Sequence, residues 1–241
     1  MIDDPTRQRE SQSDEVRDIA RQTVGMFFEV GAIHLNPAKP FIFTSGWASP
    51  VYVDCRKLIS YPKVRSRIIS LAVSTISRTV GQDAIDCVVG GETAGIPYAA
   101  WVADRLELPM LYVRKKAKGF GRNVPIEGNI VPGQRALLVE DLATDGASKV
   151  QFTSSLRSAG LEVKHCFVVF YYDIFPGSRK LLADLSLSLH HLATWWDVLA
   201  FVRETKVYEP SVIGELERYL HEPAQWSAEH GGIAEFSRSQ A

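Results

Sequence analysis

The stretch that decides the fold is Ala136–Ser148, ALLVEDLATDGAS. Four apolar residues typical of a buried strand lead into Glu140 and Asp141, and a turn of small residues then leads into a helical pattern at 147–159. Paired carboxylates suit a polyol or a hydrated cation, and small residues at a helix N-terminus present backbone N–H groups to a phosphate. The stretch therefore favours a sugar phosphate, although an acidic strand end followed by a capped helix also explains it.

Strand and helix patterns alternate on both sides of this stretch. Apolar runs typical of strands occur at 87–89, 110–113, 136–139 and 163–171, and helical patterns occur at 62–80, 96–106 and 147–159. Near-continuous apolar strands between helices are typical of a mainly parallel sheet covered on both faces. The sequence therefore predicts an α/β fold whose ligands bind at the carboxyl edge of the sheet.

The remaining segments predict additions to this core. A helix is expected over 15–30, and two short strands at 41–43 and 51–53, joined by TSGWASP, indicate a small hairpin or hood at about 31–60. The connection 117–134 is long and rich in glycine and proline, which is typical of a lid. Helical patterns return at 195–204 and 210–220, before an irregular tail. We interpret 1–241 as one domain with a lid at about 115–134 and a C-terminal helical tail at about 194–241.

The composition excludes several classes of protein. A net charge of -1 over 241 residues gives no global attraction to nucleic acid or to an anionic membrane. Three widely spaced cysteines argue against a disulfide framework and against a zinc site. The polar N-terminus carries no apolar signal core, and no segment has the roughly 18 apolar residues of a membrane span. We expect a cytoplasmic protein that binds neither nucleic acid nor membrane.

Two further segments have features suited to anions. The turn GGETAG at Gly90–Gly95 lies between a strand and a helix, where glycines permit positive φ angles and a close backbone approach to an anion. A plain tight turn explains the same residues. The second segment, 114–122, holds five cations and no carboxylate. It suits either a clamp for a phosphorylated anion or a solvated charged face.

Four segments in this order resemble the type I phosphoribosyltransferases, and among them the orotate phosphoribosyltransferases. They are FIFTSGWASPVYVD, GGETAGIP, RKKAKGFGRNVPIEG and VEDLATDGAS, and together they span roughly 30–172. The resemblance implies transfer of ribose 5-phosphate from 5-phosphoribosyl 1-diphosphate (PRPP) to orotate, giving orotidine 5'-phosphate and pyrophosphate in pyrimidine biosynthesis. It also implies Mg²⁺, held mainly by substrate oxygens and water, and a homodimer in which lid residues serve the neighbouring site.

The resemblance implies a role for each matching residue. The residues expected to bind PRPP are Arg114, Lys115, Lys118, Glu140, Asp141, Leu142, Ala143, Thr144, Asp145, Gly146, Ala147 and Ser148. The pyrophosphate turn comprises Gly91, Glu92, Thr93 and Ala94, and the orotate pocket includes Tyr52, Val53 and Thr144. Lys118 and Asp141 are the expected catalytic residues, and Arg114 and Lys118 are expected to reach the neighbouring subunit.

Some positions depart from the pattern of the family. Thr44, Ala94 and Phe120 replace residues that are basic in many members, and Ile174 stands where an arginine is expected to meet the orotate carboxylate. Asp145 places a carboxylate in a phosphate loop, so we expect its side chain to face outward and its N–H to face the phosphate. Two alternatives therefore stay open: transfer to another base, and a non-catalytic regulator that senses the ribosyl donor.

Overall fold

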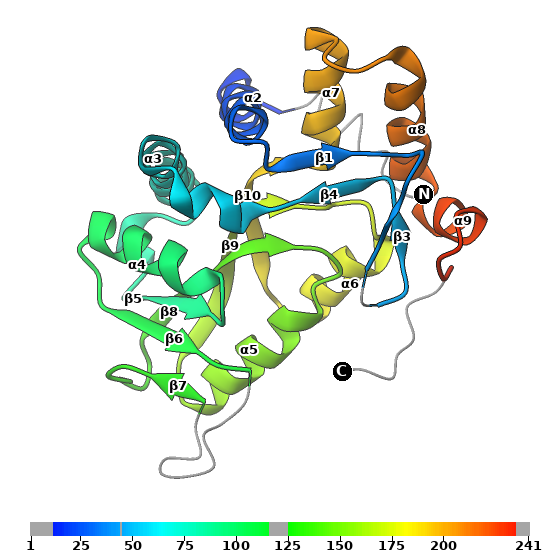
Figure 1. The fold of residues 1–241 in the computed structure, drawn as a ribbon. Coiled ribbons are helices and arrows are strands. Elements are labelled where there is room, and N and C mark those ends of the chain that lie inside the picture. The colour runs from blue at the N-terminus through cyan, green and yellow to red at the C-terminus, as the bar shows by residue number, and fades with distance from the viewer. Residues whose placement is uncertain (1–11, 44, 116–124, 235–241) are drawn as a thin grey trace. The chain divides into compact units, whose positions relative to one another are not determined.

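The computed structural model describes residues 12–43, 45–115 and 125–234 (Figure 1). The chain divides into two compact units. The first comprises Met1–Leu58, Asp173–Phe175 and Ala193–Ala241, and the second comprises Ile59–Tyr172 and Pro176–Leu192. Within the described ranges, no helix has both the length and the apolar character that crossing a membrane requires.

The second unit is built on a sheet that has six strands in the described residues, in the order β10-β9-β8-β5-β6-β7. β5 runs parallel to β6 and β8, β8 runs parallel to β9, and β7 pairs antiparallel with β6. The strands are β5 (Cys87–Gly91), β6 (Met110–Val113), β7 (Ile126–Glu127), β8 (Arg135–Ala143), β9 (Glu162–Tyr171) and β10 (Ser188–Thr194), whose last two residues belong to the first unit. The predicted α/β class with a mainly parallel sheet is confirmed.

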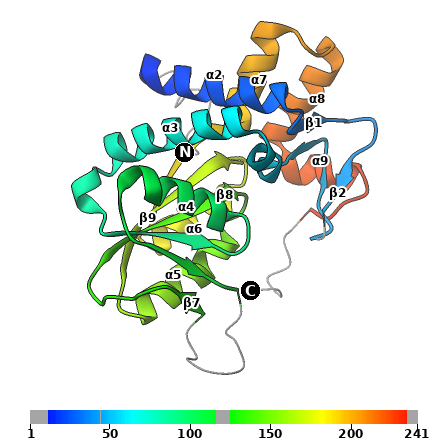
Figure 2. The same cartoon turned by 60° about the vertical axis from the view of Figure 1, so that its left-hand side comes forward.

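Helices cover both faces of this sheet. α3 (Pro62–Thr79) and α4 (Gly95–Leu106) lie on one face and α5 (Ala147–Ser158) lies on the other (Figure 2). Every residue of β5 is buried, as expected for a strand covered on both sides. The second unit also contains α6 (Pro176–Asp184) and the 3₁₀ turn η2 (Gln82–Ala84). The 3₁₀ turn η1 (Cys55–Ser60) begins in the first unit and ends in the second.

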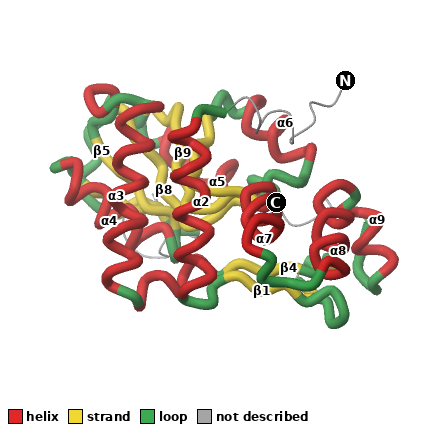
Figure 3. Tube along the Cα trace, turned by 90° about the horizontal axis from the view of Figure 1, so that it is seen from above, coloured by secondary structure: helices red, strands yellow, loops and turns green. Residues whose placement is uncertain are grey.

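The first unit combines helices with two small antiparallel sheets (Figure 3). Its helices are α2 (Asp14–Glu29), α7 (Trp195–Thr205), α8 (Pro210–His221) and α9 (Pro223–Glu229). Its strands are β1 (Ile33–Leu35), β2 (Phe41–Ile42), β3 (Ala48–Ser49) and β4 (Val51–Val53). α7 begins with a capping box, in which the Thr194 hydroxyl accepts from the backbone N–H of Asp197 and the Asp197 carboxylate accepts from Thr194.

Three expectations about the elements are wrong. The strands at 41–43 and 51–53 do not pair with each other: Gly46, at φ 85°, turns the chain so that β2 pairs with β3, and β4 pairs with β1. The tail is not irregular throughout, because α9 follows Glu222 and buries Trp226 completely. Finally, β8 continues past Val139 to Ala143, so the acidic pair lies inside the strand rather than after it.

Candidate active site

Glu140 and Asp141 lie on β8 where it pairs with β9 near the carboxyl edge of the sheet. Consecutive strand residues point to opposite faces, and Glu140 faces α5 because it pairs there with Lys149. Glu140 is only 7% exposed, whereas Asp141 is half-buried. Burial, and next the negative charge of Glu140, raise the pKa of Asp141, while the ammonium of Lys149 acts in the opposite direction.

Lys149 is the cation beneath this acidic pair, and it is only 2% exposed. Its ammonium forms an ion pair with the Glu140 carboxylate and donates to the carbonyl of Leu142 at 2.9 Å and to the hydroxyl of Ser148 at 3.2 Å. Burial works against the charged form of Lys149, but the neighbouring carboxylates outweigh it and raise its pKa. The ammonium of Lys149 thus contacts both the end of β8 and the start of α5.

The segment that we call the loop 142–148 comprises the last two residues of β8, the turn 144–146 and the first two residues of α5. Gly146 adopts a left-handed conformation at φ 86°, which is readily accessible to glycine, and α5 begins at the next residue. The Asp145 carboxylate accepts from the backbone N–H of Ala147 at 3.2 Å and from the hydroxyl of Thr144 at 3.3 Å. The Asp145 side chain, which was expected to face outward, instead turns back onto one N–H and one hydroxyl of its own loop.

The glycine turn begins with the last two residues of β5, and the Glu92–Thr93 peptide within it is cis. Gly91 and Gly95 do not adopt positive φ angles, so that part of the expectation for these glycines is wrong. They are required by close packing: a Cβ on Gly95 would lie 2.4 Å from the Val139 carbonyl oxygen, and a Cβ on Gly91 would lie 2.8 Å from Cγ of Glu140. The turn is therefore pressed against the acidic end of β8.

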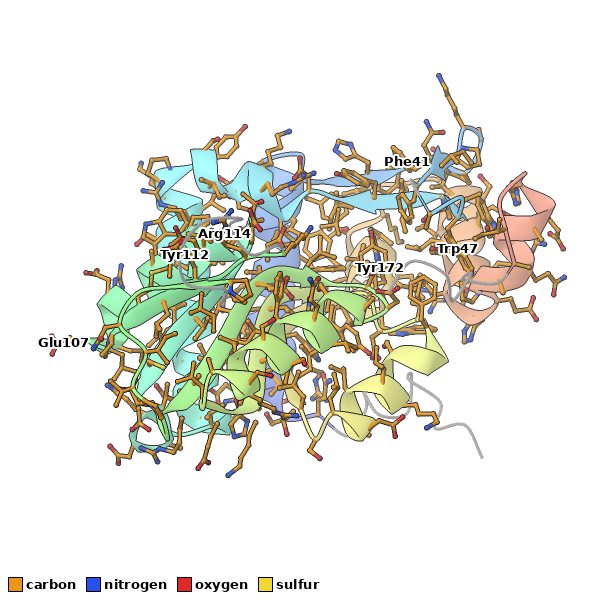
Figure 4. The ribbon with its side chains drawn as sticks, turned by 90° about the horizontal axis from the view of Figure 1, so that it is seen from below. Phe41, Trp47, Glu107, Tyr112, Arg114 and Tyr172 are labelled. Carbon is orange, nitrogen blue, oxygen red and sulfur yellow. The ribbon has the colours of Figure 1, made fainter. Side chains whose placement is uncertain are left out.

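The first residue of the expected lid, Lys115, and the preceding Arg114 are held by contacts within the second unit. The Lys115 N–H donates to the Glu92 carboxylate at 2.7 Å, and the Gln151 amide donates to the Lys115 carbonyl at 2.6 Å. Arg114, at the end of β6 (Figure 4), lies 3.5 Å from the Glu127 carboxylate on β7. Basic residues thus reach the same sheet edge as the glycine turn and the loop 142–148. Lys118, with the rest of 116–124, lies outside the described residues.

The hood residues Tyr52 and Val53 belong to the first unit, on β4. The Tyr52 ring lies near those of His34, Phe41 (Figure 4) and Phe43, with centroids 5.7–6.4 Å from its own, and its hydroxyl accepts from Arg56 at 2.9 Å. Val53 is buried, at 2% exposure.

The structure describes two of the four positions that depart from the family pattern. Ile174 is buried in the first unit, at 6% exposure, and Ala94 is the N-cap of α4. Thr44 and Phe120 lie outside the described residues.

Sequence reasoning missed Lys149, Gln151 and Glu127 as parts of the site. A signal for Lys149 existed, because it shares a helical stripe with Phe152, Thr153 and Leu156, which are all buried on α5. A lysine on an apolar stripe needs a buried partner, and Glu140 is the carboxylate that pairs with it. Gln151 contacts Lys115 and Glu127 contacts Arg114, and the local sequence does not predict either tertiary contact.

Comparison with known proteins identifies the family. Residues 61–184 match the model of the phosphoribosyl transferase domain. The orotate phosphoribosyltransferase of Roseobacter denitrificans is 49% identical over 212 residues, covering 88% of this chain and 94% of that protein. The chain belongs to the orotate phosphoribosyltransferase family.

Solved structures share the fold of the family. The orotate phosphoribosyltransferase of Aeropyrum pernix aligns with a TM-score of 0.64 and 30% identity, covering 77% of this chain and 99% of that one. Leishmania donovani UMP synthase aligns with a TM-score of 0.72 and 24% identity, covering 83% of this chain and 42% of that chain. The type I phosphoribosyltransferase fold is therefore present.

Proposed function

We propose that this chain transfers ribose 5-phosphate from PRPP to orotate and releases pyrophosphate. One observation carries the proposal. Three elements lie at one edge of the sheet in the second unit: the glycine turn, the basic end of β6, and the acidic pair with its loop. The similarity to orotate phosphoribosyltransferases over most of the chain supports the choice of acceptor.

The residues would act by binding and orientation. Breaking the bond from ribose C1 to the diphosphate builds positive charge on the ring carbon and oxygen, as in glycoside cleavage. The carboxylate of Asp141, with Glu140 behind it, would orient the ribose hydroxyls, while N–H groups of the loop 142–148 hold the 5-phosphate. Arg114, Lys115 and Lys118 would neutralise the diphosphate as it leaves.

We propose that a Mg²⁺ ion arrives with the substrate, as the resemblance implies. No group of three or more His, Cys, Asp or Glu side chains within the described ranges could hold a metal ion. We propose that diphosphate and ribose oxygens, with water, provide most of its ligands. When bound, the ion would supply charge stabilisation to the leaving diphosphate.

For the acceptor, we propose that Tyr52, Val53 and Thr144 contribute to orotate binding, as the resemblance implies. The role of Arg114 and Lys118 in a neighbouring site further implies a homodimer. Light scattering would test the dimer, and a stable monomer that retains full activity would contradict that role.

The activity itself is tested by mixing the protein with Mg²⁺, PRPP and orotate and following the ultraviolet absorbance of orotate. The absorbance should fall, and no turnover at high protein concentration would refute the proposal. Asp141→Asn should reduce kcat/KM for PRPP by about tenfold or more, because the ribose loses an ionised acceptor. The matched control is Asp184→Asn, which removes a carboxylate that is 62% exposed on α6 and should leave kcat/KM unchanged. A screen of other bases would reveal whether the buried Ile174 accompanies a different acceptor.

A further inference from the structure

A buried lysine on α5 is not explained by packing alone. Residues 149, 152, 153 and 156 form the buried stripe of the helix, and an apolar side chain at the first position would avoid the cost of removing an ammonium from water. Lys149 instead meets that cost through three polar contacts, two to β8, at the Glu140 carboxylate and the Leu142 carbonyl, and one to the Ser148 hydroxyl on α5. All three contacts lie at the acidic end of β8.

These contacts fix the carboxylate of Glu140 from more than one side. Lys149 pairs with it, and the Ser148 hydroxyl donates to the same carboxylate at 3.3 Å. On another side, Cγ of Glu140 lies 2.8 Å from the position that a Cβ on Gly91 would occupy. Glu140 therefore fills the space between the glycine turn and the start of α5, with little room for another rotamer.

The charges around Glu140 also require a cation. Asp141 follows it directly, and PRPP would bring further negative charge to the same loop. Cys166 on β9 is the other titratable group that interacts with Lys149 and Glu140, and burial raises the pKa of its thiol to about 12, so it stays neutral. Lys149 is thus the positive charge that balances the acidic pair from below.

We propose that Lys149 is a positioning residue for the ribosyl donor that acts through Glu140. Its ammonium holds the Glu140 carboxylate in one orientation and ties the Leu142 carbonyl to the start of α5, so that the ribose site and the phosphate loop keep a fixed separation. The proposal rests on the proposed function of this site.

A double-mutant cycle on donor affinity tests the proposal. PRPP with Mg²⁺ is titrated by calorimetry into the full chain and into Lys149→Met, Glu140→Gln and the double variant. We expect each single change to weaken binding about tenfold, and the double variant to bind about tenfold rather than about a hundredfold more weakly, because both changes remove one interaction. Thr153→Val, one helical turn along the same buried stripe, is the matched control and should bind like the wild type.

Several outcomes would overturn the proposal. A folded Lys149→Met protein that binds PRPP like the wild type would exclude a positioning role, and an additive, hundredfold loss in the double variant would exclude action through Glu140. If Lys149→Met fails to fold, the double variant, which carries no unpaired buried charge, is compared with Glu140→Gln alone; a further loss of affinity would contradict the coupling. Wild-type protein that binds PRPP but leaves orotate unconsumed would refute the proposed activity while the cycle still tests Lys149. Wild-type protein that does not bind PRPP would overturn both.

Discussion

Replacing Gly91 with alanine should destabilise the protein because the glycine turn has no room for a methyl group. The added Cβ would lie 2.8 Å from Cγ and 3.0 Å from Oε1 of Glu140, and 2.9 Å from Cε2 of Phe152. Phe152 is completely buried and Glu140 is paired with Lys149, so neither side chain can rotate away freely. The substitution must therefore disturb both the core and the buried ion pair.

The size of the effect follows from these two costs. Overpacking a core costs about 1–3 kcal/mol, and breaking a buried ion pair costs about 3–5 kcal/mol. Because Glu140 would be displaced rather than removed, we expect Gly91→Ala to lower the free energy of unfolding by about 2–4 kcal/mol, measured by urea denaturation. The control is Gly214→Ala on α8, where a Cβ meets nothing within 4 Å and should stabilise by up to about 1 kcal/mol. A Gly91→Ala protein within about 0.5 kcal/mol of the wild type would refute the packing argument.

Three further predictions concern stability. Hydrogen bonds from Arg135 lower the pKa of Asp86 to about 2, so the stabilisation from ionised Asp86 is complete above its unfolded value of about 3.9 and is lost as the pH falls toward 2. Asp86→Asn should therefore lower Tm at neutral pH and match the wild type near pH 2; a Tm difference that persists there would contradict the assignment. Burial, and next the charge of the neighbouring His165, lower the pKa of His190 to about 4, so the wild type loses stability as the pH falls from about 6.5 to 4. His190→Asn should lose less over that range in urea denaturation, and an equal loss would argue against a buried neutral imidazole. Thr194→Val removes the hydroxyl that caps α7 and should cost about 1–2 kcal/mol in urea denaturation, whereas a cost near zero would mean that the cap contributes little.

Much of the sheet and its covering helices could be predicted from the sequence because their signals are local. Met110–Val113 is a strand as predicted, and the helical pattern at 62–80 corresponds to α3. Buried parallel strands leave apolar runs, and helices leave a 3.6-residue period, whatever their neighbours are.

The pairing of the hood strands and the contacts of the site depend on residues distant in the chain. The local sequence at Phe41 and Val51 does not predict that β2 and β4 pair with different strands, because the pairing depends on the turn at Gly46 and on β1. The acidic pair was expected after the strand because charged residues are usual in loops; Lys149, nine residues beyond Glu140, offsets that charge and is consistent with β8 continuing. The positive φ angles expected for the glycine turn are likewise absent at Gly91 and Gly95, where close neighbours in space leave no room for a Cβ.

Because the acidic pair lies within a paired strand, a shift of one residue along β8 would change the face of the sheet that each carboxylate occupies. Glu140 faces Lys149 because it occupies one face of β8, and Asp141 takes the opposite face because it is the next residue. Insertion of a single residue upstream in β8 would exchange these directions, bringing Asp141 toward the lysine and turning Glu140 away. The protein should therefore tolerate changes in the length of loops outside this site far better than an odd change in the length of this strand.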